Sequence, residues 1–291
     1  SRAASIPGVR AVLTGADIDN RRVGRMLRDL PILADGVVRF VGQKVAPVAA
    51  DSLEAAEAAL AEIDVQYEPL APVLDVDAAI EASASILHPE FDTYEGRVEG
   101  ERIHPNLVAR GTRGKGTIAE GEAASDRIFE HTFETQPQHQ GYIEPHATTV
   151  MIDAEDRVQV WVNSKGPWQV RSQLAAGIGA EESEVCISPT VIGGDFGGKG
   201  GFMDTHIAYH LARATGCPVR VTMSYAEELT AGNPRHPARM TFRTGVRNDG
   251  TIVFRQALLR FDSGGYAAFK PGKGVSYGPR CLGPYRMDHA E

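Results

Sequence analysis

The chain has 291 residues, and its 38 Asp and Glu against 30 Lys and Arg give a formal net charge of −8. This acidic balance argues against a nucleic-acid-binding surface, because neutralising phosphates needs a local excess of basic residues. Apolar residues make up 42% of the chain and charged residues 23%, and no apolar run approaches the ~20 residues that span a bilayer. The composition therefore indicates a globular chain that is neither disordered nor embedded in a membrane.

The three cysteines, Cys186, Cys217 and Cys281, lie far apart and form no Cys-x-x-Cys pair. They provide neither a disulfide framework nor an iron–sulfur ligand set, which favours a cytoplasmic protein. The length corresponds to about two domains at roughly 100–200 residues each. The chain starts inside a stretch, 6–14, that reads as a turn leading into a strand, so we expect that residues upstream are missing.

The first part of the chain predicts a small strand–strand–helix–strand unit. The apolar runs 37–41 and 45–50 read as strands, and 65–67 alternates as a third. Between them a helix is expected over 53–63, with Asp51 and Ser52 as candidate N-caps. Its apolar residues recur at helical spacing, and they are Leu53, Ala56, Leu60 and Ile63. Residues 69–115 contain several prolines and predict a long connection with at most a short helix.

A second region begins near Gly116 and mixes strands with helices. Its expected strands are 130–135, 147–152, 158–162, 185–192, 219–223, 240–246 and 251–261. Helices are expected from Pro167 to Gly177 or Gly179 and over 202–215, since proline favours a first turn and glycine ends a helix. Asn248-Asp249-Gly250 is a strong hairpin signal. This mixture indicates an α/β or α+β fold.

The most distinctive stretch is Gly193–Gly201, which holds six glycines in nine residues between an expected strand and an expected helix. Glycine adopts positive φ and lets the backbone come close to a ligand. A helix N-terminus behind such a loop offers N–H groups to an oxyanion. The stretch therefore predicts a loop that contacts an anion or a cofactor.

Phosphate is one candidate ligand for this loop. Gly193, Gly198 and Lys199 fit the first seven positions of the phosphate-binding pattern G-x-x-x-x-G-K, but Gly200 stands where Ser or Thr would hold Mg²⁺. No G-x-G-x-x-G is present in the run, so a Rossmann-type dinucleotide site is not supported. A phosphate- or nucleotide-binding module on Gly193–Gly201 stays an alternative, as does a cofactor-free assembly domain.

Four segments, in chain order, resemble the molybdenum hydroxylases, the xanthine dehydrogenase and aldehyde oxidase family. Val41–Ala50, with the helix after it and Val65–Leu70, resembles the family's hammerhead domain. His139–His146 resembles the segment that enters the molybdopterin domain, and Trp161–Pro167 stands where the family has a Ser-Thr-Gln segment. Gly193–Lys199 is similar to the family's Gly-Gly-Gly-Phe-Gly-Gly-Lys loop.

The resemblance implies an α+β fold with two incomplete domains. Residues 1–84 would be an N-terminally truncated aldehyde oxidase/xanthine dehydrogenase a/b hammerhead domain, 85–115 a linker, and 116–291 the first part of a C-terminally truncated molybdopterin-binding domain. The resemblance also implies an oxidoreductase subunit that hydroxylates a carbon of a small-molecule substrate with oxygen from water. Its cofactor would be molybdenum on molybdopterin, in the cytosine dinucleotide form. Iron–sulfur and FAD subunits and the rest of the same subunit would be its partners.

The resemblance also assigns cofactor contacts to the glycine loop and to one residue before it: Gly194, Asp195, Phe196, Gly197, Gly198, Lys199 and Lys165. In the family, a backbone N–H of the loop beside the metal meets an oxygen on that metal, and Phe196 and Gly197 match this place. Preorganised backbone donors stabilise charge that develops there.

Three positions depart from the family pattern. Asp195 replaces the commoner third glycine, and Lys165 stands where the family often has Gln. Gly200 falls where purine-hydroxylating members carry a Glu that grips the substrate, which argues against xanthine. The family's catalytic Glu belongs to a downstream Gly-x-Gly-Glu segment, and Glu291 lacks that context. The catalytic base is therefore unassigned, and we expect the 291 residues alone to be inactive.

Two histidine groups suggest metal sites. His206 and His210 are four residues apart, a spacing that suits zinc, but a polar helix face is the favoured interpretation. His139, Glu144 and His146 are a second candidate cluster, for which a structural turn near the cofactor is favoured. We expect no protein-ligated metal at either place.

Overall fold

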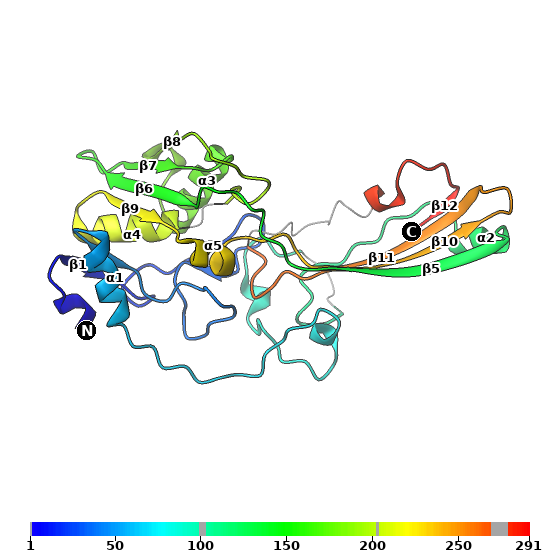
Figure 1. Cartoon of the computed structure of the whole chain (residues 1–291), viewed down its shortest axis with the longest axis horizontal. Coiled ribbons are helices and arrows are strands. Elements are labelled where there is room, and N and C mark those ends of the chain that lie inside the picture. The colour runs from blue at the N-terminus through cyan, green and yellow to red at the C-terminus, as the bar shows by residue number, and fades with distance from the viewer. Residues whose placement is uncertain (1, 99–102, 202–203, 269–278) are drawn as a thin grey trace.

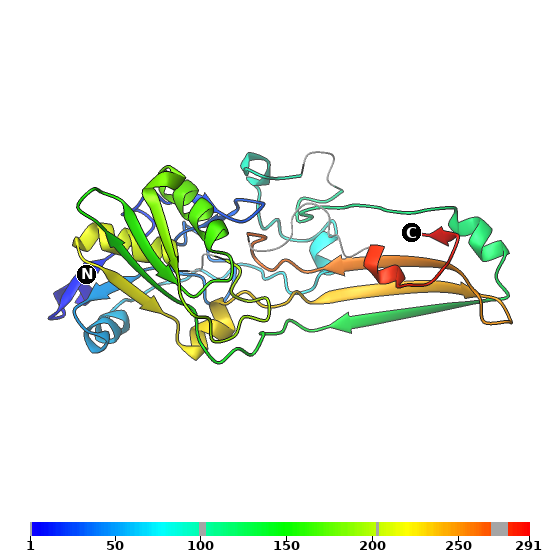
Figure 2. The same cartoon turned by 90° about the horizontal axis from the view of Figure 1, so that it is seen from above.

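The structure is a computed structural model that describes residues 2–98, 103–201, 204–268 and 279–291. Two four-stranded sheets dominate it, one packed among helices beside the N-terminal residues and the other projecting away from them (Figures 1 and 2). Among the described residues, no helix is long and apolar enough to cross a bilayer. Both helices and strands occur along the chain, as expected of a mixed fold.

The N-terminal part is built from short strands and one helix. Its elements are η1 (Arg2–Ser5), β1 (Val9–Val12), β2 (Arg22–Val23), β3 (Leu30–Pro31), β4 (Val48–Ala50) and α1 (Leu53–Ala61). β1 pairs antiparallel with β4, and β2 pairs antiparallel with β3. The Ser52 hydroxyl caps α1 by accepting a hydrogen bond from the Ala55 N–H, which confirms Ser52 as one of the two candidate caps.

Two expected strands of this part are wrong. Residues 37–41 and 65–67 lie outside any strand. Around 37–41, positive φ angles at Gly36 and Gly42 turn the chain, and the Arg39 N–H donates to the Gln43 side chain instead of a neighbouring strand.

The expected apolar face of α1 also differs from the observed one. The helix buries Ala59, whereas Leu53 and Leu60 are 70% and 48% exposed. The small alanine side chains therefore let α1 lie close to β4, and the larger leucines point elsewhere.

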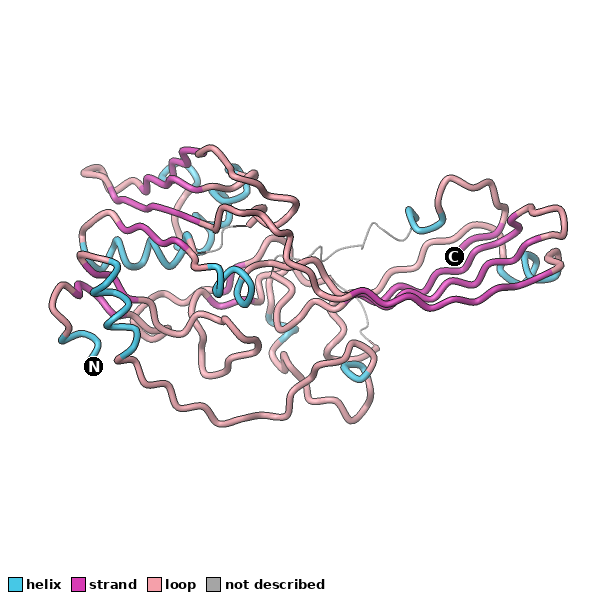
Figure 3. Tube along the Cα trace, viewed as in Figure 1, coloured by secondary structure: helices cyan, strands magenta, loops and turns pink. Residues whose placement is uncertain are grey.

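A long connection follows α1, and its described residues form two short 3₁₀ turns, η2 (Ala78–Ile80) and η3 (Phe91–Thr93), before α2 (Ile118–Ala123). Figure 3 shows how much of this stretch is loop. The observation agrees with the expected long connection.

The first large sheet has the strand order β8-β7-β6-β9. Its elements are β6 (Ala147–Ile152), β7 (Val158–Val162), α3 (Pro167–Ile178), η4 (Glu182–Glu184), β8 (Val185–Pro189), α4 (Thr205–Thr215), β9 (Val219–Thr222) and α5 (Tyr225–Ala231). β7 and β8 are parallel, and the other pairs are antiparallel. Helices α3 and α4 cover one face, where Val150, Val160, Leu174 and Ala208 share a buried cluster.

Glycines end both covering helices as expected. Gly179 follows α3 with φ 72° and Gly216 follows α4 with φ 65°, the left-handed conformation that favours glycine. α4 begins at Thr205, and the expected first residues, 202–203, lie outside the described part. The glycine run lies between the end of β8 and the start of α4, where the chain passes from the sheet to the helices that cover it.

The projecting sheet has the order β12-β11-β10-β5. It consists of β5 (Arg127–Thr135), β10 (Ala238–Val246), β11 (Ile252–Phe261) and β12 (His289–Ala290), with η5 (Pro279–Leu282) before β12. Because side chains alternate between faces, β5 and β10 bring Arg239 and Arg243 opposite Glu134 and Glu130 on one face. The other face carries aromatic rings, with Phe133 and Phe242 6.1 Å apart between centroids.

Candidate functional site

The glycine run connects β8 to α4 and takes an unusual backbone path. Gly194, Phe196 and Gly197 have φ angles of 97°, 46° and 100°. Phe196 has a side chain, so its left-handed conformation costs on the order of 1 kcal/mol and persists only where the surroundings impose it. Its ring is nevertheless 74% exposed. The loop therefore holds a large apolar ring at the surface in a strained conformation.

The glycines are required on the inner side of the loop. A Cβ at Gly198 would lie 2.5 Å from Cε1 of Tyr142 and 2.9 Å from Oε1 of Gln140, and one at Gly193 would lie 2.8 Å from Cβ of Glu144. At Gly197, by contrast, nothing lies within 4 Å of an added Cβ. The loop is thus packed against residues 140–144 and open at Gly197.

Asp195 turns back into its own loop. Its Oδ2 accepts hydrogen bonds from Lys165 Nζ at 2.9 Å and from the Gly197 N–H at 2.8 Å, while Oδ1 accepts from the Lys199 N–H at 2.6 Å. Burial alone would raise the pKa of this carboxyl, but the three donors outweigh it and lower the pKa below its usual range. Asp195 is therefore a carboxylate anion that the loop itself surrounds.

Lys199 is buried beneath the loop. Its side chain has no exposed surface, and Nζ lies 2.6 Å from Oε2 of Glu144 and 4.8 Å from the centre of the Tyr142 ring. Glu144 Oε2 also accepts the Gly193 N–H at 2.7 Å. Burial opposes ionisation of Glu144, but the Lys199 ammonium and the Gly193 N–H lower its pKa overall. Lys199 therefore ties the loop to the segment before β6 and is not free to bind an external anion.

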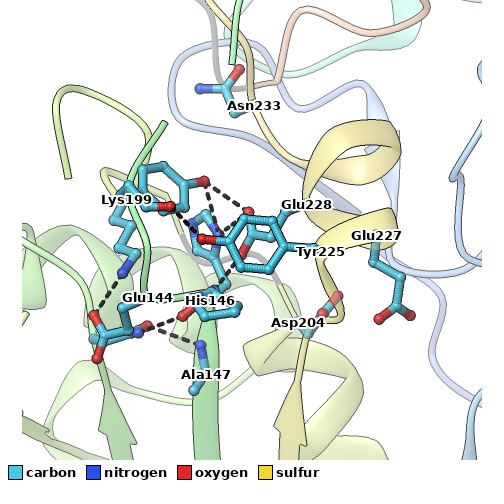
Figure 4. A network of polar contacts seen from close by, with 12 residues as sticks. Glu144, His146, Ala147, Lys199, Asp204, Tyr225, Glu227, Glu228 and Asn233 are labelled. Carbon is cyan, nitrogen blue, oxygen red and sulfur yellow. Dashed lines mark hydrogen bonds and ion pairs between the residues drawn. The ribbon is translucent and has the colours of Figure 1, made fainter. Parts of the chain in front are cut away.

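A buried carboxylate, Glu228 on α5, lies beside His146 (Figure 4). Oε2 of Glu228 accepts the Tyr142 hydroxyl at 2.8 Å, and Oε1 lies 2.9 Å from His146 Nδ1 and accepts the His146 backbone N–H. Tyr225, also on α5, donates to the Ile143 carbonyl at 2.6 Å. Helix α5 is thereby joined to residues 140–146, the segment against which the loop packs.

These contacts shift two ionisations. Burial opposes ionisation of Glu228, but hydrogen bonds from His146 and Tyr142 lower its pKa to about 2. Burial and the adjacent Glu228 carboxylate raise the pKa of Tyr142 above its usual range. Glu228 is thus an anion and Tyr142 a neutral hydroxyl throughout the physiological range.

The expected site residues come together in part. Lys165, which was expected to contact the cofactor, lies between β7 and α3 and pairs with Asp195 of the loop. His206 is buried, with Nε2 3.0 Å from the Gln173 carbonyl oxygen, so the expected polar helix face is wrong.

No metal-binding group of three His, Cys, Asp or Glu side chains occurs in the described part of the chain. In the second candidate cluster, His146 and His139 face Glu228, at 2.9 and 3.7 Å, whereas Glu144 faces Lys199. These side chains make hydrogen bonds and ion pairs with one another or with other residues of the chain.

Sequence reasoning did not identify Glu228 or the helix that carries it. The available signal was Ser224-x-x-Glu227, a capping box that the structure contains, because Ser224 Oγ accepts the Glu227 N–H and Glu227 accepts the Ser224 N–H. The capping box indicates a helix start at Tyr225 but not that Glu228 points inward.

Two family models match the chain. The model of the molybdopterin cofactor-binding domain matches residues 100–291, and that of the aldehyde oxidase and xanthine dehydrogenase a/b hammerhead domain matches residues 1–71. Together they cover most of the chain in the order expected from the sequence.

Similar curated proteins agree with these matches. The chain is 30% identical over 287 residues to a probable xanthine dehydrogenase subunit of Bacillus subtilis, and the match covers 98% of this chain and 37% of that relative. It is 29% identical over 289 residues to the nicotinate dehydrogenase large molybdopterin subunit of Eubacterium barkeri, covering 98% of this chain and 64% of the relative. The chain thus spans less than two thirds of the length of these relatives.

Solved structures show the same architecture. A Cu,Mo-CO dehydrogenase in its carbon monoxide reduced state matches with a TM-score of 0.85 and 25% identity, covering 100% of this chain and 38% of that one. Quinoline 2-oxidoreductase from Pseudomonas putida 86 matches with a TM-score of 0.75 and 26% identity, covering 88% and 32%.

Proposed function

Because the chain belongs to the xanthine dehydrogenase and aldehyde oxidase family of molybdopterin-binding proteins, we propose that it serves as part of the large subunit of a molybdenum hydroxylase. The intact subunit would hydroxylate a carbon atom of a small molecule with oxygen from water. The observation that carries the proposal is the loop Gly193–Lys199, which is fixed from within and open at Gly197. We keep 1–84, 85–115 and 116–291 as the proposed domain division.

The loop has the features that a large cofactor requires. The Phe196 N–H finds no acceptor among the described residues, the Phe196 ring is exposed, and the space beside Gly197 is open. A pterin cofactor offers both polar edges and flat apolar surface to such a loop. Phe196 and Gly197 are therefore the residues proposed to lie against it, with Gly194 and Gly198 giving the loop its shape.

The cofactor supplies the oxidation chemistry, in which the substrate carbon gains oxygen and two electrons leave. The residues of this chain bind and orient it. Phe196 offers a backbone donor to the cofactor, while Lys199 and Glu144 hold the loop from beneath. Because Lys165 and Lys199 already face carboxylates, backbone donors and shape would contribute more to binding than the charge of these two lysines.

We propose further that the electrons pass to separate iron–sulfur and FAD subunits. These 291 residues contain three cysteines, fewer than the four that one cluster needs, so they hold no four-cysteine cluster by themselves. The cytosine dinucleotide form of the cofactor and a cytoplasmic location are part of the same proposal.

The substrate is proposed to be something other than xanthine. Gly200 has no side chain with which to hold a substrate ring, and the space beside it is taken by Cε of Lys165, 3.3 Å from where a Cβ would lie. A relative that hydroxylates a ring through a Glu at this place would therefore use a contact that this chain does not make.

The alternative of a phosphate- or nucleotide-binding loop is disfavoured by the contacts. The Gly193 N–H donates to Glu144, and the Gly197 and Lys199 N–H groups donate to Asp195. Lys199, the lysine of the phosphate pattern, is buried against Glu144. A phosphate would have to displace two carboxylates to use these donors.

Cofactor content tests the proposed function. The intact protein, purified from a molybdenum-replete host, is expected to contain molybdenum and pterin equimolar with the chain, and to release CMP on acid hydrolysis. Elemental analysis and pterin fluorescence measure this. Absence of molybdenum, under conditions that load a related enzyme, would contradict the proposal.

The isolated 291 residues provide a second test. Since the family's catalytic Glu lies in a segment that this sequence does not contain, we expect no substrate-dependent dye reduction by this chain alone. Turnover by the isolated chain would place the catalytic base within these residues. It would contradict the proposal that the base lies in a segment outside them.

A further inference from the structure

The glycine loop contains its own anion. The Asp195 carboxylate accepts the N–H groups of Gly197 and Lys199, which lie on the same loop, and the ammonium of Lys165, which lies 30 positions earlier in the chain. Positive φ at Phe196 and Gly197 turns the chain here, and the Gly198 N–H, between the two N–H groups that donate to the side chain, donates to the Asp195 backbone carbonyl at 2.8 Å. Such a concave arrangement of N–H groups commonly binds an external anion, and here a side chain of the same loop occupies it.

Lys165 is connected to the loop by its backbone as well as by its side chain. The Lys165 N–H donates to the Lys199 carbonyl at 3.1 Å, and the hydroxyl of the preceding Ser164 donates to the same carbonyl at 3.0 Å. Residue 199 is therefore held through its N–H by Asp195 and through its C=O by residues 164–165. The Lys165–Asp195 ion pair closes this set of contacts across the loop.

We propose that Asp195 and Lys165 are positioning residues that fix the glycine loop before any cofactor binds. Asp195 serves as the permanent anion for the Gly197 and Lys199 N–H groups, and Lys165 neutralises it. The Phe196 N–H is then left for a ligand, as are those of Gly194 and Asp195, since none of the three has an acceptor among the described residues. Only this last point rests on the proposed function; the fixing of the loop does not.

The two residues contribute unequally. Asp195 is mostly buried and makes hydrogen bonds that involve a full charge, which are stronger than neutral ones. Lys165 is about half exposed, and exposed ion pairs contribute little. Removal of the Asp195 carboxylate should therefore loosen the loop much more than removal of the Lys165 charge.

Hydrogen exchange of the loop amides tests the proposal in protein made by a host that lacks molybdopterin. In Asp195→Ala, the Gly197 and Lys199 amides are expected to exchange roughly tenfold faster or more, since each loses a charged acceptor. Asp195→Asn should retain part of the protection, because one amide oxygen still accepts, and Lys165→Gln should change the rates only a few-fold. Wild-type exchange rates in Asp195→Ala would overturn the proposal.

Chemical rescue separates a missing anion from a general loss of structure. Acetate, which supplies a small carboxylate, is expected to restore slow exchange at Gly197 and Lys199 in Asp195→Ala, whereas chloride at the same ionic strength should not. A failure of acetate to slow exchange in the variant would overturn the internal-anion assignment.

A more exposed ion pair elsewhere provides the control. Arg10 Nε lies 2.8 Å from Asp51 Oδ1 in the N-terminal part, away from the loop. Arg10→Gln and Asp51→Ala are expected to leave exchange of the loop amides unchanged, and equal acceleration in these controls would overturn the proposal.

Molybdenum content gives the remaining readout. In a molybdenum-replete host, Asp195→Ala should contain several-fold less molybdenum than wild type, and unchanged content would contradict a role in positioning the loop for the cofactor. If wild-type protein holds no molybdenum yet its loop shows the predicted exchange pattern, then the proposed function fails while the internal anion stands.

Discussion

Glu228 is the most deeply buried carboxylate in the network behind the loop, with no exposed side-chain surface. Its hydrogen bonds to Tyr142 and His146 join α5 to the segment on which the loop packs. A buried charge in such a network is stabilising only while its partners are in place. Loss of the Glu228 carboxylate should therefore lower the stability of the protein and loosen the packing of the loop.

The stability of the protein should depend on Glu228 ionisation in acid. The pKa is about 2 in the folded protein against an ordinary value of 4.5. A carboxyl with a lowered pKa contributes stability above its ordinary pKa, and this contribution is lost as the pH falls from 4.5 towards 2. Glu228→Gln should cost about 3 kcal/mol at neutral pH, and less in acid.

Urea unfolding at neutral pH and at about pH 3 measures this difference. The exposed α1 carboxylate gives the control Glu57→Gln, which should leave stability unchanged at both pH values. An equal loss of stability for Glu228→Gln at the two pH values would show that ionisation of Glu228 is not the cause.

Gly198 tests the packing of the loop on its support. The Cβ of Gly198→Ala would lie 2.5 Å from the Tyr142 ring, so the loop or the ring must move, at a cost of about 1–3 kcal/mol. Thermal unfolding should show this loss, with reduced molybdenum content. Gly111→Ala, where an added Cβ meets nothing within 4 Å, is the control. Equal unfolding temperatures for the two variants would contradict the packing.

Among the elements, the strand bounds were predicted most accurately where apolar residues alternate along the sequence and are also buried in the fold. β6 and β7 have the expected bounds, because Val150, Val158 and Val160 alternate into one buried cluster. The strand expected at 37–41 failed because an apolar run alone does not provide a partner strand. In α1 the larger side chains are exposed and an alanine is buried, which helical spacing alone does not reveal.

Helix α5 shows how a short element positions the site. It has seven residues and was not predicted, yet it carries Glu228 and Tyr225 to the segment before β6. Its capping box at Ser224 and Glu227 fixes where it begins. Loss of the Ser224 cap should therefore weaken the hydrogen bonds that Glu228 makes to Tyr142 and His146.

Ser224→Ala should destabilise the protein by about 1 kcal/mol, the usual cost of losing an N-cap. Denaturant unfolding measures it, and exchange of the His146 amide, which donates to Glu228, should rise in parallel. Thr230→Ala, which removes a hydroxyl that donates to the Ala226 carbonyl of the same helix, is the control. Unchanged His146 exchange in Ser224→Ala would show that the cap does not support the network.

At the scale of the whole molecule, the site gathers segments far apart in the sequence. Residues 140–146, 164–165, 193–199 and 224–228 meet at the edge of the first sheet. Three of these segments were identified from their residue patterns. Their mutual contacts were not, because sequence patterns contain no information about which charged group faces which.

The pairing of Lys165 with Asp195 illustrates this limit. Each residue departs from the family pattern on its own, and a role for either was open. Only the fold shows that the two departures meet 2.9 Å apart. The glycine loop is therefore recognisable from sequence, whereas the way in which this chain stabilises it is not.

Hydrogen exchange of the loop in cofactor-loaded and cofactor-free protein tests the central claim most directly. The account predicts that cofactor loading slows exchange of the Phe196 amide, whereas the Gly197 and Lys199 amides are slow in both forms because Asp195 already accepts them. Identical exchange from Gly193 to Lys199 with and without the cofactor would contradict the claim that this loop contacts it.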